Sequence, residues 1–130
     1  MTANRSLEER VRAIEDRLEI YNVIARQVLS PDHQAAIARG LAHFTGLPHV
    51  AISGDTALVT SYLQIVVPQT EGNAVEVPNH GTSKGFRIHR ITANRWHLLR
   101  TPQGWKIKHR TLRPLDGSEP AREILRQAIT

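Results

Sequence analysis

The sequence predicts a single α+β domain, in which helices come first and antiparallel strands follow. Three observations support this fold class. Apolar residues recur every three or four positions over residues 6–29, alternate with a period of two over residues 56–67, and alternate again on both sides of a turn at 101–104. A chain of 130 residues suits one hydrophobic core. We expect the long helix to lie on a curved, mostly antiparallel sheet, with a central pocket between them.

Residues 6–29 are expected to form the first helix, because Ser6 and Glu9 make a capping box. Its apolar stripe recurs at alternating steps of four and three residues and is expected to face the sheet. The same heptad spacing would suit a coiled coil, but the chain continues into other elements, which favours packing on a sheet. The stripe consists of Leu7, Val11, Ile14, Leu18, Tyr21, Ala25 and Val28.

A second helix is expected over residues 31–44. Ser30 is a suitable N-cap, and Pro31 suits the first helical position. Gly46 and Pro48 would prevent the helix from continuing. This interpretation places His43 in the last turn of the helix, next to the start of the strands.

The remaining segments are mostly strands, expected over residues 48–53, 56–67, 84–100 and 105–113. Residues 68–83 are expected to form a loop because they are rich in proline, glycine and asparagine. A bulge is expected near Thr92 and Ala93, and a last helix over residues 119–128. A period of two places Asn94 and Trp96 on one face of their strand. It divides the returning strand into one face with Trp105, Ile107, His109 and Thr111 and another with Lys106, Lys108, Arg110 and Leu112.

The composition excludes several classes of protein. The chain has no cysteine, which excludes disulfides, thiolate metal sites and a cysteine nucleophile. No apolar run is long enough to span a membrane, and the charged N-terminus does not resemble a secretory signal, so a cytoplasmic protein is expected. No phosphate-binding loop is present and the seven histidines lack metal-ligand spacing, so neither a cofactor nor a metal is expected.

The charge is distributed unevenly along the chain. Residues 1–65 carry 6 basic and 7 acidic side chains, whereas residues 66–130 carry 11 basic and 5 acidic ones. A basic half can bind nucleic acid, which is one alternative function. A solvated basic sheet face explains the same pattern, and few aromatic residues accompany the basic ones, so nucleic acid is not the expected partner.

His43 is the candidate catalytic residue, because an imidazole near neutral pH is the usual general base. Asp32 lies eleven residues earlier, on the same face of the expected helix but about 16 Å away along it. The alternative is that His43 only interacts with the dipole at the end of that helix. Tyr62, Asn94 and Trp96 could line a pocket, with two polar groups and an apolar wall, or could simply pack in the sheet.

Three segments together resemble SnoaL-like proteins of the nuclear transport factor 2-like superfamily. They are the opening helix LEERVRAIEDRLEIYNVIAR, the segment HFTGLPHVAISGDTALVTSYL, and the closing hairpin NRWHLLRTPQGWKIKHRTLRP. The resemblance covers about three-quarters of the chain and is specific to the fold rather than to a reaction. It implies a cone-shaped α+β barrel, in which a curved sheet wraps over N-terminal helices and encloses a pocket.

The resemblance also implies roles for individual residues. In family members of the dehydratase type, a histidine at the position of His43 works with an aspartate after the first helix, here Asp32. Asn94 stands where the family has a hairpin tyrosine, and Trp96 where it has an acidic residue. Further helices and a first strand of the family are expected to be missing between about residues 26 and 31, either deleted or outside this sequence.

The leading functional hypothesis is a cofactor-free enzyme of the dehydratase, isomerase or cyclase type. It would act on a small apolar molecule by proton abstraction, with His43 and Asp32 catalytic and Tyr62, Asn94 and Trp96 binding the substrate. The alternative is a non-catalytic ligand-binding or dimerisation module of the same fold. A homodimer is expected through the outer face of the sheet, where residues such as Val66 and Leu99 are expected to be exposed.

Overall fold

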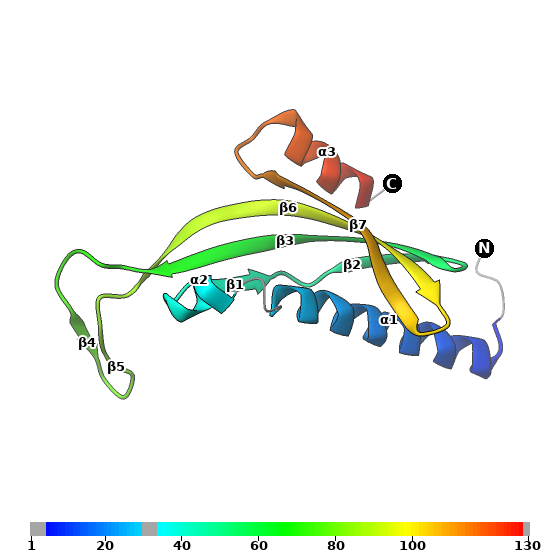
Figure 1. Cartoon of the computed structure of the whole chain (residues 1–130), viewed down its shortest axis with the longest axis horizontal. Coiled ribbons are helices and arrows are strands. Elements are labelled where there is room, and N and C mark those ends of the chain that lie inside the picture. The colour runs from blue at the N-terminus through cyan, green and yellow to red at the C-terminus, as the bar shows by residue number, and fades with distance from the viewer. Residues whose placement is uncertain (1–4, 30–33, 129–130) are drawn as a thin grey trace.

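A curved antiparallel sheet forms the centre of the structure, with a long helix on one face and a short helix on the other (Figure 1). The computed structural model describes residues 5–29 and 34–128. The predicted α+β class is confirmed, with N-terminal helices and a curved sheet. The elements are α1 (Leu7–Val28), α2 (Gln34–Ala38), β1 (Ala42–Thr45), β2 (His49–Ser53), β3 (Thr56–Pro68), β4 (Val75–Val77), β5 (Gly81–Ser83), β6 (Phe86–Thr101), β7 (Gly104–Pro114) and α3 (Glu119–Ala128).

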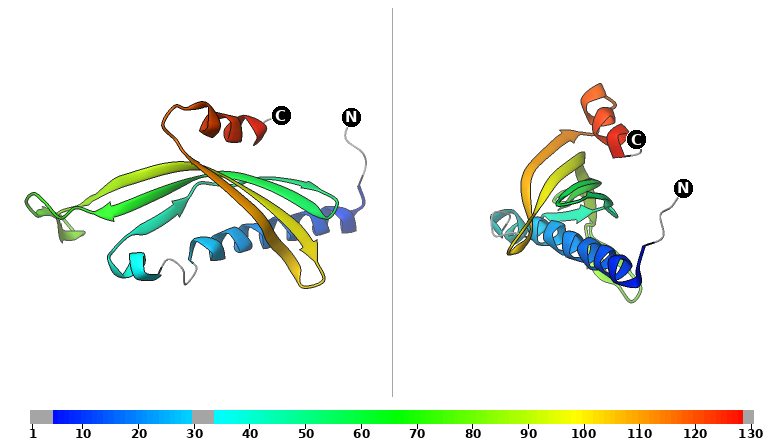
Figure 2. Two further views of the ribbon diagram at one scale, coloured as in Figure 1. Left: turned by 45° about the horizontal axis from the view of Figure 1, so that its top comes forward. Right: turned by 90° about the vertical axis from the view of Figure 1, so that its right-hand side faces the viewer.

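The main sheet has the strand order β1-β3-β6-β7. Strand β2 lies on the same side of β3 as β1. It pairs with the first residues of β3, whereas β1 pairs with later ones. β3 and β6 form its long central pair, which curves across the molecule (Figure 2). At the far end of that pair lies a separate hairpin of β4 and β5. The prediction of an irregular loop over residues 68–83 is therefore wrong in part. A turn closed by a 2.9 Å hydrogen bond from the His80 N–H to the Val77 carbonyl lets the two short segments pair.

Helix α1 begins as predicted, since the Ser6 hydroxyl accepts a 3.1 Å hydrogen bond from the Glu9 N–H. Its packing face differs from the predicted stripe, because Ile20 and Ile24 are the buried residues of the helix. The first half of the stripe is exposed, with exposed fractions of 72% for Leu7, 43% for Val11, 59% for Ile14 and 57% for Leu18.

Polar contacts explain this orientation of α1. Both carboxylate oxygens of Asp16 accept hydrogen bonds from Arg100 of β6, at 2.7 and 2.8 Å. The Trp105 Nε1–H of β7 donates to the same carboxylate at 3.2 Å, and Arg17 donates to the Val50 carbonyl at 2.9 Å. These bonds fix the side of α1 that carries Asp16 against the sheet, so the opposite side faces away from it.

Two hydrophobic clusters lie on the two faces of the sheet. The larger one joins α1 to the sheet around Val59, Trp96, Leu98 and Trp105, with Ile20 and Ile24 from the helix. The smaller one joins α3 to the other face through Ala93, Ala121 and Ile124. We call the α1 side of the sheet the inner face and the α3 side the outer face.

A bulge in β7 changes which residues face inward. Leu98 pairs with Ile107, but the neighbouring His97 pairs with His109, so Lys108 has no partner in register. The predicted alternation is therefore wrong beyond this point. Arg110 pairs with Trp96 on the inner face, and His109 lies opposite His97 on the outer face. A second bulge lies in β6, where Ile65 pairs with Arg90 and Val66 with Ile88, so that His89 has no partner in register. It is in the strand where a bulge was predicted, but earlier than Thr92 and Ala93.

The predicted helix over residues 31–44 is also corrected. Helix α2 ends at Ala38 and β1 begins at Ala42. Between them, Gly40 has a φ of +90°, and a Cβ there would lie 2.7 Å from the Pro68 Cγ. The link can therefore turn sharply against the end of β3 and enter the sheet. Ser30, Pro31 and Asp32 lie outside the described residues. Of the junction where a family segment is expected to be missing, residues 26–28 belong to α1 and Leu29 is its C-cap, while residues 30 and 31 are not described.

Within residues 5–29 and 34–128, no helix is long and apolar enough to cross a membrane. The same part of the chain contains no group of three or more histidine or carboxylate side chains placed to hold a metal ion.

Candidate functional site

His43 lies on β1, an edge strand of the sheet, and its side chain is on the inner face. His43 pairs with Ile65 of β3, and residues that pair in an antiparallel sheet share a face. Ile65 shares its face with Val59, which packs against α1. The His43 side chain is half-buried, and its Nδ1 atom is shielded from solvent. His43 is thus a strand residue, and the predicted position at a helix C-terminus is wrong.

Two cavities lie beside β1, one on each side of His43. Thr45 lines a cavity of about 270 Å³, whose other walls come from the last turns of α1 and from Leu47 and Pro48. Leu41 lines a cavity of about 400 Å³ at the other end of β1. Leu41 and Thr45 are about 13 Å apart along an extended strand. His43 thus lies between the two cavities on the inner side of β1, although it is not among the residues that line either one. We call the line along β1 from Leu41 to Thr45 the inner-face path.

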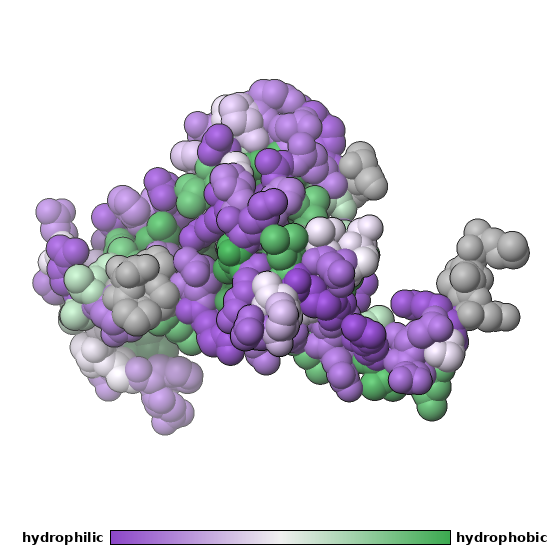
Figure 3. All heavy atoms as spheres, turned by 45° about the vertical axis from the view of Figure 1, so that its right-hand side comes forward, coloured by the Kyte–Doolittle hydropathy of each residue, from purple (hydrophilic) through white to green (hydrophobic). Residues whose placement is uncertain are grey.

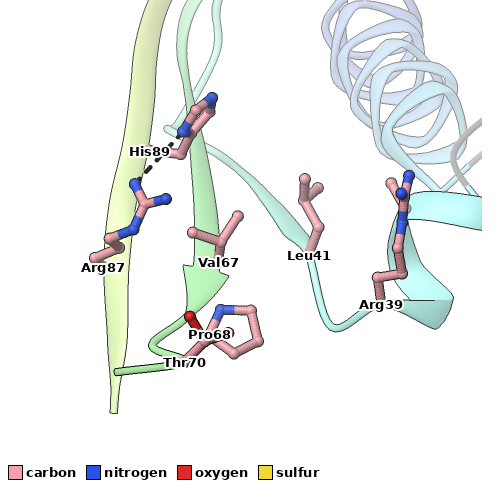
Figure 4. A pocket seen from close by; sticks show the side chains of 8 residues that line it. Arg39, Leu41, Val67, Pro68, Thr70, Arg87 and His89 are labelled. Carbon is pink, nitrogen blue, oxygen red and sulfur yellow. Dashed lines mark hydrogen bonds between the residues drawn. The ribbon is translucent and has the colours of Figure 1, made fainter. Parts of the chain in front are cut away.

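The cavity beside Leu41 brings three cationic or basic side chains together (Figure 4). Arg39 directly follows the last residue of α2, and Arg87 and His89 come from β6. Arg87 donates a 3.5 Å hydrogen bond from Nη1 to the His89 Nδ1. Apolar walls complete the cavity, formed by Ala36, Leu41, Val67 and Pro68. No carboxylate is among the described residues that line it.

Asn94 and Trp96 lie elsewhere, in the buried centre of the inner face, and both have an exposed fraction of 0%. The Asn94 Oδ1 accepts hydrogen bonds from Arg110, from Nη2 at 2.7 Å and from Nε at 3.1 Å. The Asn94 amide donates to the Thr92 hydroxyl at 2.7 Å. The Arg110 guanidinium lies 5.3 Å from the centre of the Trp96 ring.

Burial of Arg110 lowers the pKa of its guanidinium, and no carboxylate pairs with it among the described residues. Arg110 is on β7, whereas His43 is on β1, at the opposite side of the strand order. The structure therefore assigns Asn94 to a buried polar pair with Arg110 and Trp96 to the core, and neither side chain has surface available to a ligand.

Tyr62 lies on the outer face, away from His43. It pairs with Ala93, which packs against α3, and its exposed fraction is 52%. Tyr62 lines an apolar cavity of about 540 Å³ together with Phe44, Gln64, Ile91 and Leu115. The structure thus separates Tyr62 from His43, Asn94 and Trp96, which are on the other face of the sheet. Asp32 lies outside the described residues.

Sequence reasoning missed the cluster of Arg39, Arg87 and His89. Arg39 is far from the other two along the chain, and only the pairing of β1 with β3 and of β3 with β6 brings them together. The predicted helix over residues 31–44 included Arg39, whereas in the structure the helix ends just before this residue. A signal was present in the basic second half of the chain, which carries Arg87 and His89.

Comparisons with known proteins agree with this architecture. Residues 33–111 match the sequence model of the SnoaL-like domain family. The structure is similar to the crystal structure of an NTF2-like protein with a cystatin-like fold from Novosphingobium aromaticivorans, with 27% identity, a TM-score of 0.73, and coverage of 96% of this chain and 98% of that one. It has a weaker likeness, with 24% identity and a TM-score of 0.42, to a candidate dehydratase of the NTF2-like family from Streptomyces avermitilis, over 58% of this chain and 47% of that one. No protein with a curated description matches the sequence.

Proposed function

Because the chain belongs to the SnoaL-like domain family, we propose that it binds a small molecule along the inner side of β1 and acts on it by proton abstraction. The reaction type is that of a dehydratase, isomerase or cyclase that needs no cofactor. One observation carries the proposal. His43 is half-buried on the inner face, between one cavity that begins at Thr45 and another that begins at Leu41.

The imidazole of His43 would act as the general base. It would take a proton from a carbon next to a carbonyl group, and the electron pair of that C–H bond would form the new double bond. In a dehydration, the imidazolium would return the proton to the departing hydroxyl group, which leaves as water. Shielding of Nδ1 from solvent favours a fixed ring orientation, which a general base requires. Asp32, the orienting carboxylate that the family resemblance implies, stays a prediction because it lies outside the described residues.

Solvent-proton exchange tests this proposal without knowledge of the natural substrate. A panel of small ketones and β-hydroxy ketones is incubated with the protein in D2O, and loss of the α-proton or of water is followed by NMR. His43→Gln should lower the rate about 10²–10⁴-fold, because glutamine can form hydrogen bonds but cannot take up a proton. His49→Gln is the matched control, since His49 is exposed on β2. Turnover that survives His43→Gln would refute the role of His43.

The second candidate function is a binding module without catalysis. It is favoured by the lack of a carboxylate among the described residues that line the two cavities on either side of His43. A general base usually has such a partner to hold its tautomer. Ligands that shift the NMR signals of Leu41 and Thr45, with no exchange or elimination in either the wild type or His43→Gln, would favour this function over the enzyme.

A further inference from the structure

The cavity of Arg39, Arg87 and His89 has the chemistry of an oxyanion site. We propose that the small molecule carries a carboxylate or phosphate group that binds here, while its apolar body extends past His43 toward Thr45. This inference rests on the proposed function, because it assigns the substrate class of the same inner-face path. It follows from the side chains that line the two cavities and from their order along β1.

The cationic side chains of the cavity are available for a ligand. Arg39 and Arg87 take part in no ion pair among the described residues, whose ion pairs involve Arg100, Arg122 and Arg126. Figure 4 shows Arg39 on one side of the cavity and Arg87 with His89 on the other. Guanidinium groups bind carboxylates and phosphates through paired N–H donors, and two of them at one cavity favour an anion strongly over a neutral group.

The backbone holds the two sides of the cavity in place. Gly40, next to Arg39, lies so close to Pro68 that a Cβ would be 2.7 Å from the Pro68 Cγ. Arg87 pairs with Val67 in the register of β3 and β6. Both arginines are thus tied to the same end of β3, so their separation does not depend on a long loop. Thr70, also in the lining, adds a hydroxyl group that can donate to an oxyanion.

The apolar part of the ligand has a defined direction. Leu41 and Val67 continue the lining of the cavity toward His43 on the inner face, and the next cavity along β1 has walls of Tyr21, Ile24, Leu47 and Pro48. An amphipathic acid with an apolar body therefore fits the path better than a small inorganic anion does.

Binding of a matched pair of probes tests the inference. 4-Phenylbutyrate and 4-phenylbutan-1-ol differ only in the anionic group, and both are titrated while backbone amide shifts of Thr45, Val67 and Arg87 are recorded. The acid should bind at least about tenfold more tightly than the alcohol, and Arg39→Gln and Arg87→Gln should each remove about tenfold of the affinity for the acid. Arg113→Gln, which removes the same charge from an exposed position on β7, should change it less than about twofold.

Three outcomes would overturn the proposal. Equal affinity for the acid and the alcohol, or no binding of either, would exclude an oxyanion site. Tighter binding of inorganic phosphate than of 4-phenylbutyrate would exclude the apolar path. The affinity for benzyl phosphate, compared with that for 4-phenylbutyrate, shows whether the site prefers a phosphate or a carboxylate group. Failure of the proposed function would be seen separately. Tighter binding of the acid than of the alcohol, with no α-proton exchange or elimination by the wild type, would support the oxyanion site and refute the enzyme.

A second inference comes from α1. We propose that the exposed stripe of Leu7, Val11, Ile14 and Leu18 binds the same stripe of a second copy in a parallel coiled coil. The first half of α1 extends past the β6–β7 hairpin (Figure 1), and apolar side chains lie along the underside of this projecting part (Figure 3). Leu7 and Asp16 are about two and a half turns apart, so the stripe is on the side of α1 opposite the sheet contact.

Charge complementarity selects the partner and its direction. With Leu7 and Ile14 at d positions and Val11 and Leu18 at a positions, Arg10 is at g and Glu8 and Glu15 are at e. In a parallel pair, Arg10 of each copy faces Glu15 of the other, which gives two ion pairs. In an antiparallel pair, Glu8 would face Glu15 and Arg10 would face Arg17, which places like charges together. The sequence around the stripe therefore favours a parallel pair of identical helices.

Sedimentation analysis of charge-swapped variants tests this inference. The wild type should be a dimer, and Ile14→Glu should make it a monomer. Arg10→Glu should weaken the dimer about tenfold, and Arg10→Glu with Glu15→Arg should restore it. A monomeric wild type would overturn the proposal, as would a dimer strengthened by Arg10→Glu. A dimer that persists in Ile14→Glu but is lost in Tyr62→Glu would instead support the outer sheet face that the sequence analysis expects.

Discussion

Replacement of Asp16 by asparagine tests the contact that orients α1 on the sheet. Asp16 accepts two hydrogen bonds from Arg100 and one from Trp105. Its side chain is 13% exposed and that of Arg100 is 24% exposed, so solvent screens the pair only in part. Asparagine keeps the shape of the side chain but removes the charge and replaces one acceptor oxygen with an N–H donor that faces the guanidinium.

The expected cost follows from these contacts. A hydrogen bond to a charged group contributes about 1.5–3 kcal/mol, and the three bonds share one carboxylate, so their contributions are not additive. Arg100 keeps a second ion pair, with Asp55 at 3.1 Å, but the Asp55 side chain is 81% exposed and so contributes little. We expect Asp16→Asn to lower the free energy of unfolding by about 2–3 kcal/mol near neutral pH.

Urea unfolding measures this difference directly. Trp96 and Trp105 are 0% and 2% exposed, so their fluorescence reports loss of the core. Asp55→Asn is the matched control and should change the free energy of unfolding by less than about 0.5 kcal/mol. An effect of Asp16→Asn as small as that of the control would show that burial of Ile20 and Ile24, rather than the charged contact, positions α1.

The pH dependence gives a second check on the same residue. The hydrogen bonds from Arg100 are the main reason that the pKa of Asp16 is lowered from 3.8. Because the folded-state pKa is below the unfolded-state value, the stabilisation is complete well above pH 3.8 and is lost as the pH falls through the folded-state pKa. The stability difference between wild type and Asp16→Asn should therefore be constant near neutral pH and shrink below about pH 4.

Further substitutions test the hairpin turn, the packing of α1 and the buried pair of Asn94 and Arg110, each by urea unfolding. Gly104→Ala should cost about 1–2 kcal/mol, because φ is +100° there and a Cβ would collide with the Glu19 carboxylate; a neutral effect would show that the hairpin turn relaxes. Ile24→Ala should cost about 2–5 kcal/mol, since Ile24 is 1% exposed, and Ile14→Ala should cost far less in the monomer. Asn94→Leu should lower the free energy of unfolding because it removes the oxygen that accepts two hydrogen bonds from Arg110. The double variant Asn94→Leu with Arg110→Met should recover part of that free energy. No recovery would show that the two residues are not coupled.

Local sequence patterns predicted most of the fold, because capping, turn chemistry and a period of two act over a few residues. Ser6 caps α1 as expected, and the strands on both sides of residues 101–104 form the expected hairpin. The orientation of α1 could not be predicted in this way. Its apolar stripe is longer and more regular than the buried set of Ile20 and Ile24, and the contact that decides the orientation joins Asp16 to Arg100, far away in the sequence.

The candidate site shows the same division between local and distant information. His43 was singled out from the sequence, but its place on a strand depends on the sharp turn at Gly40 against Pro68, which a local helical pattern does not reveal. The inward orientation of Arg110 depends on one unpaired residue, Lys108. The alternation of side chains along the sequence cannot reveal such a bulge, because the residues on both sides of Lys108 would suit a strand with the bulge and a strand without it.

The positions of the arginines favour one class of reaction over others. Arg39 and Arg87 lie beside the end of β1, and no carboxylate is among the described residues that line the two cavities next to His43. Such an arrangement stabilises negative charge on a ligand and opposes positive charge. Proton abstraction next to a carbonyl creates an enolate, whereas reactions through a carbocation create positive charge. The same residues that would attract an acidic substrate would therefore also stabilise the charge that develops when His43 removes its proton.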